Sequence, residues 1–159
     1  MSEIDQLLVS LADSLKRKGW MLATAESCTG GWIAKSCTDL AGSSVWFERG
    51  FVTYSNEAKQ SMLGVKAATL EQFGAVSEPV VCEMAVGALQ HSLAQVALSV
   101  SGIAGPGGGT LSKPVGTVCF GWACANGRVK TRTEHFSGDR ESIRIQSVRY
   151  ALDGLSDSL

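Results

Sequence analysis

The chain has 159 residues, which is enough for one ordinary domain but too few for two full-sized ones. Apolar residues make up 45% of it and charged residues 18%, a composition that excludes a disordered chain or a coiled coil. The formal net charge of -1 gives no large positive field, so binding along a nucleic-acid backbone is not expected as the main activity. We predict one domain over residues 1–159 that binds no nucleic acid.

The sequence shows no sign of export, membrane insertion or metal binding. Its first residues lack a basic segment followed by an apolar one, and no apolar run approaches the roughly 20 residues that span a bilayer. Five cysteines without a C-x-x-C pair indicate reduced thiols, not a disulfide framework or a zinc site. The two histidines, His91 and His135, form no H-E-x-x-H arrangement. We therefore predict a cytoplasmic protein without a metal, a cofactor or a membrane partner.

Helical and extended patterns alternate in the first half of the chain. Ser2 is a typical N-cap for apolar residues at helical spacing, and Gly19 is a typical helix end. Ser55 is the corresponding cap of a later, shorter helix. In chain order we predict a helix before Gly19, a strand over 20–25, a helix over 32–40, a strand over 45–55 and a helix over 56–63.

The second half predicts one brief turn of helix near Thr69, two further helices and three strands. Asn126-Gly127 favours a type I′ hairpin turn, in which both central residues have positive φ. The predicted elements are a helix from Ser77 to about 94, a strand over 95–101, a glycine-rich loop over 102–114, strands over 115–124 and 128–136, and a last helix capped by Asp139. In that last helix, the residues predicted to face the sheet are Ile145, Val148, Ala151, Leu152 and Leu155.

The order of these elements predicts the fold class. Helices between the early strands imply parallel crossovers, and the Asn-Gly hairpin supplies an antiparallel pairing. We predict an α/β fold, namely a three-layer α/β/α sandwich with a mixed, mostly parallel five-stranded sheet.

Ser27 is the first candidate for chemistry. It follows a predicted strand and precedes Gly30-Gly31 and a helix, a turn that lifts a hydroxyl above the sheet edge beside amides able to stabilise an oxyanion. The alternative is that Ser27 and Thr29 only cap the helix. No G-x-S-x-G elbow is present, and neither histidine lies in a pattern typical of a Ser-His-Asp triad.

Lys59 and Tyr54 form the second candidate pair. Lys59 lies one turn into the helix that follows the second strand, within reach of the ligand edge of the sheet. A lysine whose pKa is lowered by burial serves as a general base for serine in Ser-Lys hydrolases. Tyr54 would orient the lysine or stack on a ring. The alternatives are a solvated lysine and an aromatic residue at the edge of the core.

A glycine-rich loop and two arginines are candidate ligand contacts. Residues 102–109 let backbone amides approach an anion, although they match neither a Walker A loop nor G-x-G-x-x-G. Arg140 and Arg144 lie one turn apart at the start of the last helix, where side chains and helix dipole both attract phosphate. A plain flexible loop and an exposed basic helix face remain the alternatives.

Five motifs in a fixed order resemble one known family, the CinA C-terminal family. The motifs are Ala25-Glu26-Ser27-Cys28-Thr29-Gly30-Gly31, Thr53-Tyr54-Ser55-Asn56-Glu57-Ala58-Lys59, Gly74-Ala75-Val76-Ser77, Ser101-Gly102-Ile103-Ala104-Gly105-Pro106 and Lys113-Pro114-Val115-Gly116-Thr117-Val118. The resemblance covers almost the whole chain and is most marked to the nicotinamide-nucleotide amidase branch. It implies a Ser-Lys amidohydrolase that converts nicotinamide mononucleotide (NMN) and water to nicotinic acid mononucleotide and ammonia.

The resemblance also implies roles for individual residues. Ser27 would attack the carboxamide carbon, Lys59 would take its proton, and Tyr54 and Thr29 would support them. Backbone amides near 28–30 or in the 102–109 loop would hold the oxyanion. The residues expected to contact the nucleotide or its phosphate are Gly30, Gly102, Gly105, Gly107, Gly108, Arg140 and Arg144.

Two other functional hypotheses stay open at this point. One makes Cys28 the nucleophile of the same reaction. The other is a non-catalytic nucleotide-binding or protein-interaction domain linked to competence or a DNA-damage response. Four tryptophans and many apolar residues also predict self-association, most simply as a homodimer.

Overall fold

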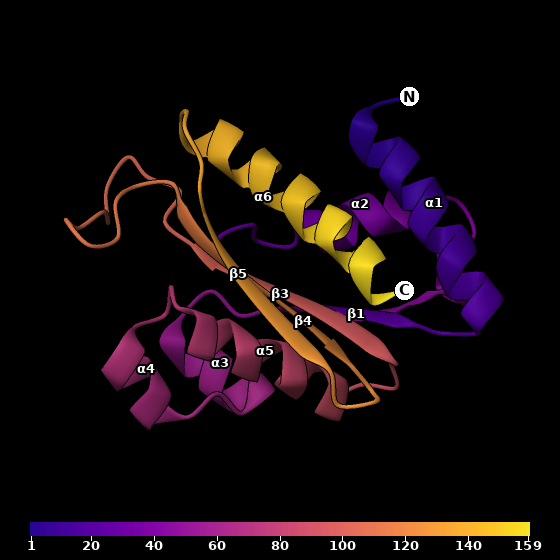
Figure 1. Ribbon diagram of the computed structural model, residues 1–159, viewed down its shortest axis with the longest axis horizontal. Coiled ribbons are helices and arrows are strands. Elements are labelled where there is room, and N and C mark those ends of the chain that lie inside the picture. Colours follow the sequence, from indigo (N-terminus) through magenta and orange to yellow (C-terminus); the bar gives the residue numbers. More distant parts are fainter.

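The computed structural model describes all residues, 1–159, and is built around one five-stranded sheet with helices on both faces (Figure 1). The strands are β1 (Leu22–Glu26), β2 (Phe47–Val52), β3 (Val96–Gly102), β4 (Thr117–Cys124) and β5 (Val129–His135). They lie in the order β2-β1-β3-β4-β5. Every residue of β1 and β4 is buried, so the centre of the sheet is covered on both faces.

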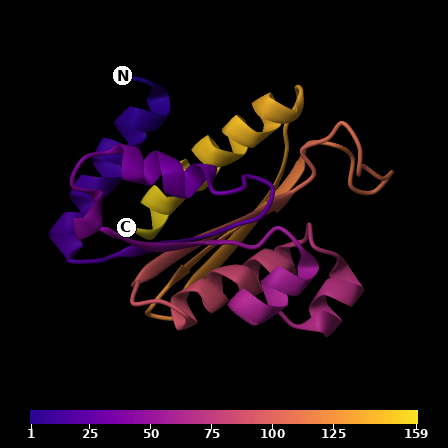
Figure 2. The ribbon, with the colours of Figure 1, turned by 180° about the vertical axis from the view of Figure 1, so that it is seen from behind.

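Six α-helices form the two outer layers. They are α1 (Glu3–Lys18), α2 (Trp32–Asp39), α3 (Asn56–Leu63), α4 (Ala67–Phe73), α5 (Glu78–Gln90) and α6 (Arg140–Leu155). Helices α1, α2 and α6 cover one face, and α3, α4 and α5 cover the other, as Figures 1 and 2 show from opposite sides. Two separate apolar clusters match these layers, with 22 buried residues on the α1/α2/α6 face and 11 on the α5 face. The predicted three-layer α/β/α sandwich is confirmed.

Four of the five strands run in the same direction, and only β4 opposes them. β1 pairs parallel with β2 and β3, whereas β4 pairs antiparallel with β3 and β5. The β3–β4 pairing is a second antiparallel pairing that the sequence analysis did not predict. No helix connects these two strands, and a strand that returns without such a crossover can pair only antiparallel.

The predicted helix caps are largely confirmed. Ser2 accepts a hydrogen bond from the Asp5 amide, and the Asp5 carboxylate accepts one from the Ser2 amide, which completes a capping box. Ser55, Ser77 and Asp139 each cap the helix that follows them. Near Thr69 the structure has a helix of 7 residues, longer than the single turn predicted.

Two details of the sequence prediction are wrong. Asn126 does not have positive φ, so the hairpin turn is not type I′. Instead, the Gly127 amide donates to the Cys124 carbonyl, and only Gly127, at φ 92°, is left-handed. Ile145 is 41% exposed, and Ile143 takes its place in the core at 1%. The apolar face of α6 is therefore rotated from the predicted one, because Ile143 lies four residues before buried Ser147 and eight before Ala151, on the side that meets the sheet.

No helix in the structure has the length and apolar character needed to cross a bilayer.

Candidate active site

Ser27 and Lys59 meet at the edge of the sheet where β1, β2 and β3 end. Ser27 directly follows β1, and its amide donates to the carbonyl of Val100 in the neighbouring β3. Lys59 lies in the first turns of α3, which Ser55 caps immediately after β2. The Nζ of Lys59 is 3.0 Å from the Oγ of Ser27. The carboxyl ends of adjacent parallel strands thus bring together two residues 32 positions apart.

The ammonium group of Lys59 is enclosed by neutral groups. Its side chain is 1% exposed, and Nζ also donates to the carbonyls of Thr53 at 3.0 Å and Tyr54 at 3.1 Å. No carboxylate accepts a hydrogen bond or forms an ion pair with it. Burial disfavours the charged form and lowers the pKa of Lys59 below its ordinary value. The lysine is therefore suited to accept a proton from Ser27.

Glu26 is a buried residue next to Ser27 whose anchoring role the predictions from the sequence do not include. It is fully buried, and its Oε1 accepts hydrogen bonds from the Thr29 hydroxyl at 2.6 Å and the Ile33 amide at 2.8 Å. Its Oε2 accepts from the Ala34 amide at 3.0 Å. The N-cap position of α2, Gly31, has no side chain to cap the helix, so the Glu26 carboxylate does so instead. An acidic residue at a strand end, shortly before a helix that starts at glycine, is the sequence signal for this role.

A cavity of about 220 Å³ opens beside Ser27 and Lys59. Among the predicted site residues, it brings together Ser27, Lys59, Tyr54, Gly102 and Arg140. The other lining residues are Cys28, Asn56, Ala75, Val76, Ser101 and Ala104. The wall formed by residues 75 and 76 comes from the Gly74-Ala75-Val76-Ser77 motif, whose role the sequence alone did not indicate.

Arg140 bridges two walls of this cavity. Its Nη1 donates to the Gly105 carbonyl at 2.7 Å, and its Nη2 donates to the Tyr54 hydroxyl at 3.5 Å. Tyr54 is 63% exposed, so its ring lies at the rim, whereas its backbone carbonyl holds Lys59. The cation and the tyrosine hydroxyl thus lie at the outer end of the cavity, away from the buried lysine.

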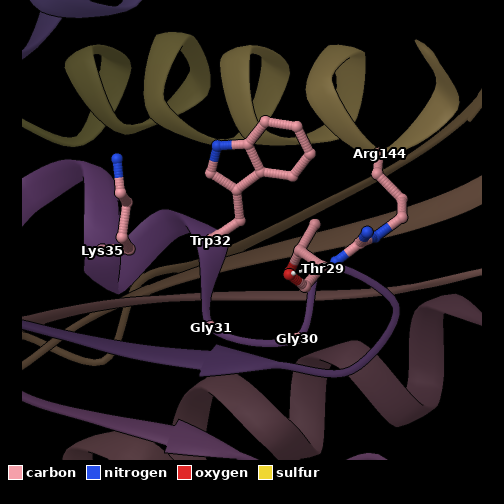
Figure 3. Close-up of a pocket in the computed structure, with 6 residues that line it drawn as sticks. All are labelled: Thr29, Gly30, Gly31, Trp32, Lys35 and Arg144. Atoms are coloured by element: carbon pink, nitrogen blue, oxygen red, sulfur yellow. Dashed lines mark hydrogen bonds between the residues drawn. The ribbon is translucent and has the colours of Figure 1, made fainter. Parts of the chain in front are cut away.

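Six predicted site residues are absent from the lining of the Ser27 cavity: Thr29, Gly30, Gly105, Gly107, Gly108 and Arg144. Thr29, Gly30 and Arg144 line a separate, open hollow of about 420 Å³ together with Gly31, Trp32 and Lys35 (Figure 3). The Thr29 hydroxyl is bound to Glu26. Figure 3 shows the Arg144 side chain reaching from α6 to the Thr29–Gly30 backbone.

The outer part of the glycine-rich loop also lies away from the cavity lining. Gly107 and Gly108 are exposed, and a Cβ added at Gly107 would meet no atom within 4 Å. The loop projects beyond the sheet on the left of Figure 1. Only its first residues, near Gly102 and Ala104, line the cavity.

The thiol of Cys28 is protonated at neutral pH. Burial raises the pKa of Cys28 to about 12. Because the thiolate is the nucleophilic form, this environment disfavours the hypothesis of a cysteine nucleophile. Neither histidine lines the cavity: His91 follows the end of α5, where its Nδ1 is bonded to the Gly87 carbonyl, and His135 is exposed on β5.

Comparison with known proteins gives matches along the whole chain. The family described as CinA C-terminal domain matches residues 4–159. A protein of Escherichia coli K12 named nicotinamide-nucleotide amidohydrolase PncC is 60% identical over 154 residues, which are 97% of this chain and 93% of the relative. A protein of the same name from Pseudomonas putida is 49% identical over 155 residues, covering 98% of this chain and 96% of the relative.

A solved structure agrees with the fold. The crystal structure of the competence/damage inducible protein CihA from Agrobacterium tumefaciens superposes with a TM-score of 0.96 at 46% identity. The match covers 99% of this chain and 96% of that one. Sequence and structure therefore agree from end to end, and the chain belongs to the CinA C-terminal domain family.

Proposed function

We propose that this protein hydrolyses the carboxamide of NMN to nicotinic acid mononucleotide and ammonia, with Ser27 as nucleophile and Lys59 as general base. Two relatives at 60% and 49% identity, both matched along nearly their whole length, carry the name of a nicotinamide-nucleotide amidohydrolase. Similarity at this level, along the whole chain, favours the same substrate and reaction.

One observation carries the mechanism: a buried lysine without an acidic partner lies 3.0 Å from a serine hydroxyl in a cavity. Burial of an unpaired ammonium group costs free energy, and a structural role does not require it. A lysine with a lowered pKa, beside a hydroxyl, is the arrangement that activates a serine. The geometry thus favours an enzyme over a domain that only binds.

The reaction begins with attack on the carboxamide. Neutral Lys59 accepts the hydroxyl proton of Ser27 as Oγ bonds to the carboxamide carbon, and the carbonyl π electrons move onto oxygen. Lys59 then gives a proton to the amide nitrogen, the C–N bond breaks, and ammonia leaves a nicotinoyl ester on Ser27. Water attacks this ester, Lys59 takes the water proton, and the serine leaves with a proton from Lys59. This step releases the carboxylic acid, which loses its proton to solvent to give the carboxylate product, and it restores the Ser27 hydroxyl and neutral Lys59.

The oxyanion needs donors that are fixed before the reaction. The amide of Cys28 directly follows the nucleophile and donates no hydrogen bond to backbone or side chain within the chain. Cys28 also lines the cavity. We assign this amide as an oxyanion donor, by the same logic as the residue after the nucleophile in other serine hydrolases.

Arg140 is our candidate for binding the phosphate of NMN. It lies at the outer end of the cavity, and its current acceptors are a neutral carbonyl and a tyrosine hydroxyl. A phosphate offers charged acceptors and forms stronger hydrogen bonds with a guanidinium. Tyr54 at the rim is then placed to contact the pyridine ring, and Gly102 lets the substrate approach the end of β3.

We further propose that the enzyme is cytoplasmic, binds no nucleic acid and forms a homodimer. The five free cysteines support a reducing compartment, and the net charge of -1 gives no large positive field to attract a nucleic-acid backbone. Analytical ultracentrifugation would measure the oligomeric state, and a single monomeric species at micromolar concentration would contradict the dimer.

Ammonia release from NMN by the purified protein tests the proposal. The assay contains EDTA and compares the parent protein with Ser27→Ala. Release by the parent alone supports a metal-independent, serine-dependent amidase. Absence of release from folded parent protein across a range of pH would overturn the proposed activity, and full activity of Ser27→Ala would overturn the mechanism.

A further inference from the structure

The turn that carries the nucleophile is anchored from α6 by one arginine. We call residues 27–30 the nucleophile turn. The Nε of Arg144 donates to the Cys28 carbonyl at 3.0 Å, and its Nη2 donates to the Thr29 carbonyl at 3.2 Å. These contacts join residues 116 and 115 positions apart in the sequence. A guanidinium presents its donors as a rigid fork, so two bonds to successive carbonyls fix both position and orientation.

Arg144 is itself held in place by packing. Its guanidinium carbon lies 5.4 Å from the centre of the Trp32 ring, a cation–π distance. Figure 3 shows Trp32 at the start of α2, with its indole ring beside the side chain of Arg144. Gly30 lies close to the same group, because a Cβ added there would be 3.4 Å from Nη2. The arginine therefore packs against the outside of the nucleophile turn.

The same turn is anchored on its other side by Glu26. The buried carboxylate binds the Thr29 hydroxyl, while Arg144 binds the Thr29 carbonyl. Within the turn, the Gly30 amide donates to the Ser27 carbonyl at 3.0 Å. Because a trans peptide directs its N–H opposite to its C=O, this bond also sets the direction of the Cys28 N–H. Contacts on both sides therefore fix the peptides that follow Ser27.

The position of Arg144 does not suit contact with a substrate held by Ser27. Arg144 is absent from the lining of the Ser27 cavity and lies in the other hollow, whereas Arg140, one turn earlier, lines the cavity. The two arginines, which the sequence suggests as a pair of phosphate contacts, are thus separated by the nucleophile turn.

We propose that Arg144 is a positioning residue, which holds the nucleophile turn so that Ser27 and the Cys28 amide keep their reactive geometry, and that it is not a phosphate contact. The inference rests on the proposed amidase function. Displacement of reacting groups by about 1 Å costs on the order of 100-fold in rate, and loss of one oxyanion donor costs a similar factor. Substitution of Arg144 should therefore lower kcat rather than raise KM.

Three arginines on α6 allow a matched experiment with purified full-length protein and NMN. We expect Arg144→Ala to lower kcat by roughly 100-fold with little change in KM. Arg140→Ala should instead raise KM, and Arg149→Ala should leave both constants unchanged. Arg149 is a suitable control because its only ion pair is with exposed Glu3 at the far side of the helix. A rise in KM for Arg144→Ala with unchanged kcat would overturn the inference.

Two further measurements separate positioning from misfolding. Free guanidinium at low, non-denaturing concentration should restore part of the kcat of Arg144→Ala, because it can occupy the emptied position beside the two carbonyls. Arg144→Lys should remain impaired, since an ammonium keeps the charge but lacks the planar fork. A fully active Arg144→Lys would overturn the inference. Absence of activity in the parent protein would instead overturn the proposed function, so the two failures are distinguishable.

Discussion

The Nζ of Lys59 lies 3.0 Å from the Oγ of Ser27 and donates its other two hydrogen bonds to the backbone carbonyls of Thr53 and Tyr54. Three acceptors use all three donors of an ammonium group. When the lysine loses a proton, its nitrogen gains a lone pair that can accept a hydrogen bond. Of the three surrounding oxygens, only that of the serine hydroxyl carries a hydrogen to donate to it. The surrounding carbonyls thus direct proton transfer toward Ser27.

The first prediction concerns the nucleophile. Ser27→Ala should lower ammonia release from NMN by about six orders of magnitude, as expected when a covalent nucleophile is removed. The measurement is a coupled ammonia assay on parent and variant at equal concentration. The fold should be retained, because the substitution removes one partly buried hydroxyl at a cost of about 1 kcal/mol. A variant that retained the parent rate would show that another group attacks the carboxamide.

The second prediction is a pH dependence of activity from Lys59. Because the reaction requires the neutral amine, kcat/KM should rise with pH through the pKa of Lys59, which burial lowers from its ordinary value of 10.5. Measurement of kcat/KM for NMN as a function of pH tests this rise directly. A rate that fell with rising pH over the same range would argue against Lys59 as the base.

The same pKa shift predicts a pH dependence of stability. Between the lowered pKa of the folded protein and 10.5, the unfolded lysine binds a proton that the folded one does not. The free energy of unfolding should therefore rise with pH in this window, by up to about 1.4 kcal/mol per pH unit, and level off above it. Denaturant unfolding of the parent and of Lys59→Met at several pH values isolates the contribution of Lys59 to the free energy of unfolding. If this free energy changed with pH in the same way for both proteins, the prediction would be contradicted.

The third prediction concerns Cys28. Its pKa of about 12 leaves almost no thiolate at neutral pH, so iodoacetamide should not label Cys28 in the native protein. Mass spectrometry of the alkylated protein should show label first at Cys82, which is only partly buried, and at all five cysteines after unfolding. Ammonia release should survive native alkylation. Rapid labelling of Cys28 with matching loss of activity would revive the cysteine nucleophile.

The fourth prediction tests Glu26 as a structural anchor. Glu26→Gln replaces one carboxylate oxygen by an NH2 group, whose hydrogens face the N–H and O–H donors that bind the carboxylate in the parent. The free energy of unfolding should therefore fall by about 3 kcal/mol. Urea unfolding measures the change. The matched control is Glu3→Gln, because the Glu3 carboxylate forms only an exposed pair with Arg149, and such pairs contribute less than about 1 kcal/mol. Equal stability of Glu26→Gln and the parent would refute the anchoring role.

The sequence predicted the layers of the fold because local patterns specify them. Capping residues such as Ser2 and Ser55 mark helix starts by side-chain hydrogen bonds that span only three residues. Apolar periodicity then identifies the faces that must be buried. The sequence predicts the wrong type of turn between β4 and β5, because Asn126-Gly127 suits more than one hairpin geometry and the strand pairing around it selects among them.

The sequence also identified Ser27 and Lys59, through motif resemblance, but it could not separate Arg140 from Arg144. Both arginines lie on the same helix one turn apart, so their spacing predicts a phosphate contact for each of them equally. Their roles depend on where the nucleophile turn lies, and that position is set by β1 more than 100 residues earlier. Only the tertiary structure decides which arginine meets the cavity.

Sequence patterns predict the order of helices and strands, most of the apolar faces that build the two cores, and the motifs that supply a serine and a lysine. The elements and their apolar faces follow from interactions within one or two helical turns or between strand neighbours, whereas the serine and the lysine are identified by the resemblance of their motifs. The packing of distant segments, in contrast, buries Lys59 without an acidic partner, places Glu26 at the start of α2 and brings Arg144 to two backbone carbonyls. Burial and long-range hydrogen bonds depend on how distant segments of the chain pack together. Local sequence patterns do not specify that packing.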